Sequence, residues 1–185
     1  MEPKVSAELS ALQQGGIVVY PTEAVWGIGC DPRNEHAVMS LLKAKQRPVE
    51  KGLILIASDY SQLTPYINES KIPDERKSDI FNSWPGPYTW LLPVAEDTPA
   101  WITGGSELVA VRVTAHPTVI RMCNEFQGAI ISTSANVTGT PTEHLLENVK
   151  QVFGNQVDVY VDEALGGNTQ ASTITNSLTG EVIRG

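Results

Sequence analysis

The chain has 185 residues, of which 41% are hydrophobic, and its formal net charge is −8 at pH 7. These values are ordinary for a soluble globular protein and exclude a disordered chain, a collagen and a coiled coil. No apolar run approaches the roughly 18 to 20 residues that span a bilayer. The start, Met1 to Lys4, lacks the pattern of a signal segment, so we expect a cytosolic protein.

The two cysteines and the net negative charge exclude further classes of protein. Cys30 and Cys123 lie far apart and match no metal-ligand spacing. We therefore expect reduced thiols, without a disulfide framework or a zinc site. The net negative charge argues against a protein that coats nucleic acid with its whole surface, while a local basic site stays open.

Hydrophobic patterns of helix and strand type alternate along the chain. The first part predicts a helix from the cap Ser6 to 13–14, a strand at 17–20, a structured loop over 21–33, a helix over 34–45 and a buried strand at 53–57. The rest predicts strands at 89–94, 108–113, 129–133 and 157–161, and helices at 74–81, 117–126 and 144–153. This alternation predicts the α/β class, with one domain over 1–185 built on a twisted mixed sheet flanked by helices.

One lysine stands out within the helix predicted over 34–45. Its apolar stripe runs through Val38, Leu41 and Leu42, and the next position at helical spacing is Lys45. We therefore predict that Lys45 emerges from the edge of the buried face at the helix end, not from the solvent side.

Positive charge is concentrated around this helix end. Five basic and two acidic residues lie between Arg33 and Lys51, a net charge of +3, so the remainder of the chain carries −11. An acidic protein with one basic island often holds an anion there. Lys43 is better explained as a complement to the negative helix end. For Lys45 and Arg47 we favour an anion site, because a guanidinium in the turn before Pro48 can grip phosphate oxygens in a fork.

A run of small, mostly polar residues, 132–136, follows directly on the apolar strand residues 129–131. Ligands of open α/β sheets bind beyond the carboxyl ends of strands, so this run is a candidate site. Hydroxyls that satisfy the backbone of an ordinary loop explain it equally well. A serine nucleophile is disfavoured, because no Gly-x-Ser-x-Gly elbow surrounds these serines and no histidine is assigned to them.

Other polar residues have weaker signals. Thr22, directly after the first strand, suits either a ligand or a turn. Arg112 is a charge in an apolar strand and needs a carboxylate partner, either from a ligand or from an internal Asp or Glu. Ser172 follows a glycine pair and Arg184 follows a short apolar pair, a weak pattern for oxyanion binding. We interpret as surface or capping residues the three histidines, His36, His116 and His144, and expect no metal held by the protein.

Five short motifs occur in one order along nearly the whole chain: Pro21-Thr22-Glu23-Ala24, Lys45-Gln46-Arg47-Pro48, Pro85-Gly86-Pro87, Val111-Arg112-Val113 and Ser134-Ala135-Asn136. Together they resemble the YrdC-like domain family, most closely its short bacterial L-threonylcarbamoyladenylate synthases. The resemblance implies a large concave, positively lined cavity. It also implies a nucleotidyltransferase that makes threonylcarbamoyl-adenylate and pyrophosphate from L-threonine, bicarbonate and ATP, for modification of an adenosine beside the anticodon of tRNA.

The resemblance also implies roles for individual residues. Those expected at the nucleotide phosphates are Lys45, Arg47, Ser134, Asn136 and Arg184, with Lys45 and Arg47 stabilising charge during the reaction. Those expected at threonine are Thr22, Arg112, Thr133 and Ser172, with Arg112 at the carboxylate. Magnesium would accompany ATP and would not occupy a protein site. The implied partners are transferase proteins that use the product, with a weak tRNA contact allowed.

A departure and two rival functions remain. Many relatives have a second hydroxyl where this chain has Ala24, which removes one contact to threonine. The main rival is a non-catalytic RNA-binding or ribosome-maturation factor that docks RNA in the basic concavity. The charge of −11 elsewhere and the lack of aromatic residues among the basic ones argue against it. A carbamoyl-phosphate-handling domain is a third reading, without the cysteine-rich neighbours such domains have.

Overall fold

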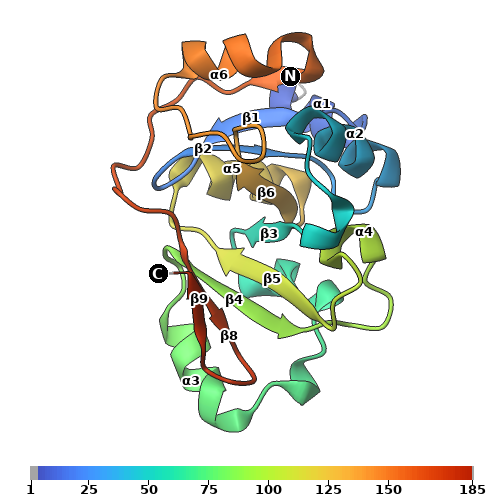
Figure 1. The fold of residues 1–185 in the computed structure, drawn as a ribbon, viewed down its shortest axis with the longest axis vertical. Coiled ribbons are helices and arrows are strands. Elements are labelled where there is room, and N and C mark those ends of the chain that lie inside the picture. The colour runs from blue at the N-terminus through green and yellow to red at the C-terminus, as the bar shows by residue number, and fades with distance from the viewer. Residues whose placement is uncertain (1–3, 185) are drawn as a thin grey trace.

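A nine-stranded mixed sheet runs through residues 4–184, which are the residues that the computed structural model describes (Figure 1). The strand order is β7-β1-β2-β6-β3-β5-β4-β8-β9. The strands are β1 (Val18–Pro21), β2 (Trp26–Gly29), β3 (Ile54–Ala57), β4 (Tyr88–Pro93), β5 (Leu108–Val113), β6 (Ile130–Ser134), β7 (Val159–Tyr160), β8 (Thr173–Asn176) and β9 (Val182–Arg184). Parallel pairing joins β1 to β7, β3 to β5 and β4 to β8, and the other neighbours are antiparallel. The α/β class and the mixed sheet are confirmed.

Three of the six α-helices within residues 4–184 begin at a side-chain cap. The helices are α1 (Ala7–Gln13), α2 (Glu35–Lys45), α3 (Asp74–Asn82), α4 (Ala100–Thr103), α5 (Pro117–Phe126) and α6 (Leu146–Phe153). Ser6 Oγ accepts from the Leu9 amide at 3.2 Å, and Asn34 Oδ1 accepts from the Ala37 amide at 3.0 Å. These bonds satisfy amides that the first helical turn leaves unpaired. Within residues 4–184, no helix is long and apolar enough to cross a membrane.

The two faces of the central strands have different environments. In β5, Val109, Val111 and Val113 alternate into the main core, where they join Leu55 and other buried apolar residues. The intervening side chains, from Leu108 to Arg112, point to the opposite face and line a cavity. This alternation follows from the two-residue period of a strand. One end of the cavity face is covered by α1 and α5, whose apolar residues pack on β1, β3 and β6.

The loop predicted over 21–33 is wrong in part, because it contains β2. A Cβ built on Gly29 would lie 1.8 Å from the carbonyl oxygen of Ile131, and one on Gly27 would lie 2.7 Å from the ring of Tyr20. Tyr20 lies close over this strand, and its hydroxyl donates to the Ile131 carbonyl at 2.9 Å. The glycines therefore permit close strand packing, although in the sequence they resemble loop residues.

The short strands at the chain's end also differ from the prediction. No strand was expected at β8 or β9, and the strand expected over 157–161 is reduced to the two residues of β7. β8 has four residues and β9 has three, which is too short for an apolar alternation to mark them as strands in the sequence. Their pairing to β4 and to each other supplies the order instead. The helix expected from 144 begins two residues later, at Leu146.

Candidate functional site

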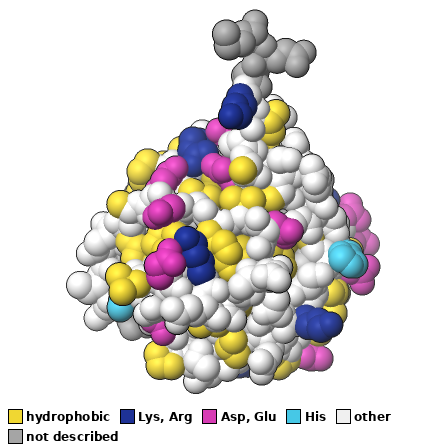
Figure 2. All heavy atoms as spheres, turned by 90° about the horizontal axis from the view of Figure 1, so that it is seen from above, with side chains coloured by type: hydrophobic (Ala, Val, Ile, Leu, Met, Phe, Trp, Pro, Cys, Tyr) yellow, Lys and Arg dark blue, Asp and Glu magenta, His cyan; other side chains and the backbone are white. Residues whose placement is uncertain are grey.

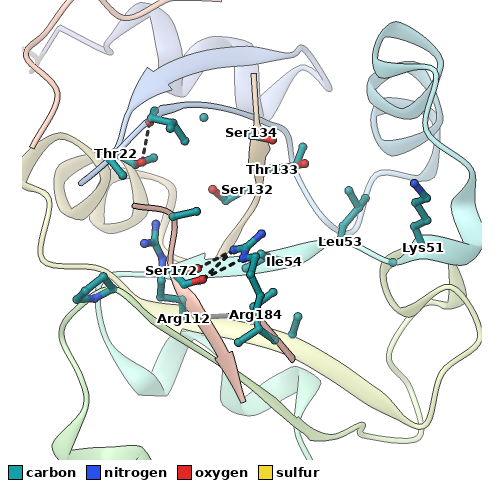
Figure 3. A pocket seen from close by; sticks show the side chains of 18 of the residues that line it. Thr22, Lys51, Leu53, Ile54, Arg112, Ser132, Thr133, Ser134, Ser172 and Arg184 are labelled. Carbon is teal, nitrogen blue, oxygen red and sulfur yellow. Dashed lines mark hydrogen bonds between the residues drawn. The ribbon is translucent and has the colours of Figure 1, made fainter. Parts of the chain in front are cut away.

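A cavity of about 710 Å³ occupies the open part of the sheet face described above (Figure 3). It is lined by side chains from β3, β5, β6, β8 and β9, by the turn after β1, and by residues 169–171 between β7 and β8. In Figure 3, Thr22, Arg112 and Ser172 lie at one end, and Lys51 and Leu53 lie at the other. Seven of the site residues predicted from the sequence line it: Thr22, Arg47, Arg112, Thr133, Ser134, Ser172 and Arg184.

The cavity is electropositive in an acidic protein. Among the residues that line it, Arg47, Lys51, Arg112 and Arg184 are cationic, and Glu23 and Glu50 are the carboxylates. On the face of the molecule shown in Figure 2, by contrast, basic side chains are scattered singly among acidic ones. A recess with excess positive charge and low-dielectric walls concentrates anions.

Arg112 has an internal carboxylate partner. Its Nη1 lies 3.0 Å from Glu23 Oε2, and both side chains are about nine-tenths buried. Of the two partners that the sequence left open for Arg112, the internal acid is thus present in the structure. The pairing occupies only one edge of the guanidinium, which has five N–H donors. Arg112 also lines the cavity, so a second carboxylate can reach it there.

Ser172, directly before β8, and Arg184, in β9, come together because the two strands pair. The Nε and Nη2 atoms of Arg184 donate to the Ser172 carbonyl at 3.1 and 3.0 Å, and Nη2 also donates to Ser172 Oγ at 3.2 Å. Ser172 Oγ lies 2.8 Å from Thr89 Oγ1. Burial, together with the neighbouring charge of Arg112, lowers the pKa of Arg184. Two guanidiniums close enough to influence each other favour an anion between them.

Arg47 lies at the opposite end of the cavity. Its Nε and Nη2 donate to the Gly52 carbonyl at 3.2 and 3.0 Å. This fork spans the 3-10 turn η1 (Val49–Lys51) and holds it against the cavity wall. Arg47 is half-buried, so its charge is only partly solvated, and this burial lowers its pKa. Such a charge is well suited to interact strongly with an entering phosphate.

Lys45 and Asn136 lie behind the cavity wall and are not among the lining residues. The burial predicted for Lys45 is confirmed, because its side chain is 2% exposed. Its Nζ donates to the carbonyl of Ser134 and, at 2.9 Å, to that of Asn136. The Lys45 carbonyl in turn accepts from the Thr138 amide at 2.9 Å. Asn136 Nδ2 donates to the Thr140 carbonyl at 2.7 Å. Both residues thus brace the loop that carries Ser134.

The hydroxyl residues of the wall divide into paired and open groups. Thr22 Oγ1 donates to the Val25 carbonyl at 2.7 Å, so it stabilises the turn while it faces the cavity. The side chains of Thr133 and Ser134 form no hydrogen bond to another of residues 4–184, although both line the cavity. A half-buried hydroxyl without a protein partner is free to bind a ligand.

Several residues at the site were given no role in the sequence analysis. Glu23 stands beside Thr22 in a quoted motif, and that neighbourhood was the only signal for it. Lys51 belongs to the basic island, and His144 lines the cavity although it was interpreted as a surface or capping residue. The capping role of a histidine holds for His116, whose Nδ1 accepts from the Thr118 amide. Among the described residues, no group of three or more His, Cys, Asp or Glu side chains could hold a metal ion.

Comparison with known proteins places these features in a family. Residues 10–185 match the sequence model of the Sua5, YciO and YrdC family, which is described as telomere recombination. A threonylcarbamoyl-AMP synthase from Pseudoalteromonas translucida is 52% identical over 98% of this chain and 97% of its own length. Another from Klebsiella pneumoniae is 48% identical over 97% of this chain and 94% of its own length.

Solved structures agree with this match. P. abyssi Sua5, solved in complex with L-threonine, superposes with a TM-score of 0.85 and is 30% identical over 94% of this chain. The chain spans about half of that protein, 52% of its length. E. coli YciO, at 23% identity, a TM-score of 0.83 and coverage of 95% of this chain and 85% of its own, shares the fold. The chain therefore belongs to the Sua5, YciO and YrdC family.

Proposed function

We infer that the chain is a threonylcarbamoyl-AMP synthase, which converts L-threonine, bicarbonate and ATP into threonylcarbamoyl-adenylate, pyrophosphate and water. The observation that carries this inference is the cavity, which gathers cationic and hydroxyl side chains from distant parts of the chain. Close relatives that carry this enzyme name over nearly their whole length support it. The residue assignments below are our proposals.

Threonine occupies the end of the cavity beside Thr22, Arg112 and Ser172. Arg112 pairs with the threonine carboxylate through the guanidinium edge that Glu23 leaves free. Thr22, Thr133 and Ser172 supply hydroxyls for the rest of the amino acid. Holding threonine by its carboxylate leaves its amine free to attack the carbon of bicarbonate, and water leaves as the carbamate forms. Fixing the carbamate in place is a contribution of orientation.

The nucleotide extends from this end toward Arg47. A carbamate oxygen attacks the α-phosphorus of ATP, and the bond from that phosphorus to the bridging oxygen of pyrophosphate breaks. Negative charge grows on the phosphoryl oxygens and the leaving group, where Arg47 and Arg184 are placed to stabilise it. Ser134 donates to a phosphate oxygen. Lys45 and Asn136 contribute from behind the wall, by bracing the loop of Ser134.

The substrates and surroundings follow from this chemistry. ATP enters with Mg²⁺ as part of the substrate, because triphosphates carry the ion with them and retain several of its waters. We propose that the enzyme works in the cytoplasm as one domain over 1–185, and that it passes its product to the transferase proteins of tRNA modification. A net charge of −8 limits the chain itself to weak tRNA contact.

Pyrophosphate release provides the test. Purified protein is incubated with MgATP, and pyrophosphate is measured with both co-substrates, without threonine, and without bicarbonate in buffer stripped of carbon dioxide. We expect release only when both are present, and we expect the adenylate product in the same sample by mass spectrometry. Release that is indifferent to threonine contradicts the proposal. Tight, salt-sensitive RNA binding without turnover points to the docking rival.

A further inference from the structure

Glu23 is a buried carboxylate for which the reaction just described has no direct use. Glu23 is only 8% exposed, although it lines the cavity. One carboxylate oxygen, Oε1, accepts hydrogen bonds from Thr114 Oγ1 and from the amides of Ala115 and His116, the last two at 2.9 and 3.2 Å. The other oxygen, Oε2, lies 3.0 Å from Arg112 Nη1. Oε1 thus binds the chain that follows β5, while Oε2 faces Arg112.

The three donors to Oε1 hold the carboxylate in one orientation. They come from the three consecutive residues between β5 and α5. Arg112 lies near the end of β5, so the same stretch of chain supplies Arg112 and the groups that fix Glu23. Burial alone would raise the pKa of Glu23, but Arg112 and the hydrogen bonds from Thr114 and Ala115 lower it overall. The carboxylate is therefore ionised at neutral pH and presents a fixed negative charge to Arg112.

The backbone of Glu23 is fixed as well. Its carbonyl accepts from the Asn168 amide at 2.8 Å, and the Thr22 carbonyl accepts from the Gly166 amide at 2.9 Å. A Cβ on Gly166 would lie 2.6 Å from the Glu23 Cα, so the segment from β7 to β8 packs directly on this residue. Backbone and side chain are thus both held, by two different segments of the chain.

We propose that Glu23 is a positioning residue that holds the Arg112 guanidinium in the orientation needed to bind the threonine carboxylate. The proposal rests on the proposed function. Arg112 and Arg184 are near enough to repel each other, and Glu23 supplies the counter-charge for Arg112. Without that charge, the buried Arg112 guanidinium moves away from Arg184 or recruits a solvent anion, and the carboxylate site loses its shape.

The principal variant is Glu23→Gln, because the amide oxygen can still accept the three bonds at Oε1 while the charge facing Arg112 is lost. We expect the KM for threonine to rise about tenfold, equivalent to about 1.4 kcal/mol of binding free energy. We expect the KM for ATP to rise less than the KM for threonine, because Arg184 is near Arg112 whereas Arg47 lies at the opposite end of the cavity. Glu96→Gln is the control, since Glu96 is an exposed carboxylate that does not line the cavity. Both KM values should stay near those of the wild type in that control.

A double-mutant cycle distinguishes positioning from a general effect on the fold. In an Arg112→Met background, Glu23→Gln should raise the threonine KM no further, because Glu23 acts through Arg112. Thr114→Val offers a milder route that retains both charges and removes one donor to Oε1. It should give a smaller rise in the threonine KM, again with less change in the KM for ATP. This second variant keeps the proposal testable if Glu23→Gln does not fold.

The outcomes separate the two proposals. A wild-type protein without threonine-dependent pyrophosphate release refutes the proposed function before any variant is compared. In an active wild type, an unchanged threonine KM in both Glu23→Gln and Thr114→Val overturns the positioning role. Equal effects of Glu23→Gln with and without Arg112 also overturn it, because Glu23 would then act by another route.

Discussion

Lys45 allows a sharp test of how the loop behind the cavity is held, through the variant Lys45→Met. Its ammonium is buried against two carbonyls and is near Arg47. Burial, and to a lesser extent the charge of Arg47, lowers the pKa of Lys45 from 10.5 to about 7. Methionine has nearly the same length and no charge, so the variant removes the titrating group and largely preserves the packing.

The expected effect on stability has a definite sign. Between about pH 7 and pH 10.5, the unfolded chain keeps the Lys45 proton while the folded protein releases it. Unfolding therefore takes up a proton in this window, and the free energy of unfolding gains up to about 1.4 kcal/mol per pH unit from this group. From pH 7.5 to 9.0 the wild type should gain about 2 kcal/mol relative to Lys45→Met. Below pH 7 both states bind the proton, and this contribution no longer changes.

Urea unfolding followed by tryptophan fluorescence measures this difference at several pH values. Other titrating groups affect the wild type and the variant alike, so the difference between them isolates Lys45. Lys43→Met is the control, because Lys43 lies on the same helix but is exposed. The difference in the free energy of unfolding between Lys43→Met and the wild type should not change with pH. If the difference in the free energy of unfolding between Lys45→Met and the wild type stays constant from pH 7.5 to 9.0, the pKa of Lys45 is not lowered by burial. That result would refute the bracing role, which depends on this burial.

Three other predictions test the site and the fold. Arg47→Ala should lower kcat for pyrophosphate release by about a hundredfold or more, since it removes charge stabilisation at the phosphates, whereas Lys43→Ala should change it little. Gly29→Ala should cost roughly 3 kcal/mol or more in urea unfolding, because its Cβ would collide with the Ile131 carbonyl at 1.8 Å. Gly128→Ala, whose nearest neighbour would be 3.9 Å away, is the control. Chelation of Mg²⁺ should stop turnover without changing the Tm of the protein measured in the absence of ATP.

Local patterns were enough to predict much of the fold. The stripe of α2 predicted both the helix and the burial of Lys45, and Pro117 correctly marked the first turn of α5. The strand predicted at 108–113 was confirmed as β5, and its valines lie in the core. These features depend on residues within a few positions of one another, where a helical or strand period is visible in the sequence itself.

The strand β2 and the ion pair of Arg112 illustrate what such patterns miss. Gly29 was read as a loop residue because the carbonyl it must approach belongs to Ile131, far along the chain. Arg112 was known to need a carboxylate, but its choice of Glu23 depends on how β5 meets the turn after β1. No periodicity or residue spacing in the sequence predicts either of these two contacts.

From its sequence alone, this protein's class, most of its helices, its central strands and its motifs could be assigned, because these depend on short-range preferences and on residues that recur in order. Only the tertiary structure decided which of the motif residues face the cavity. It placed Arg47, Arg112 and Ser134 on the wall and Lys45 and Asn136 behind it. That division depends on how the strands pair and where the loop after β6 is held, which is decided by contacts between residues remote in the chain.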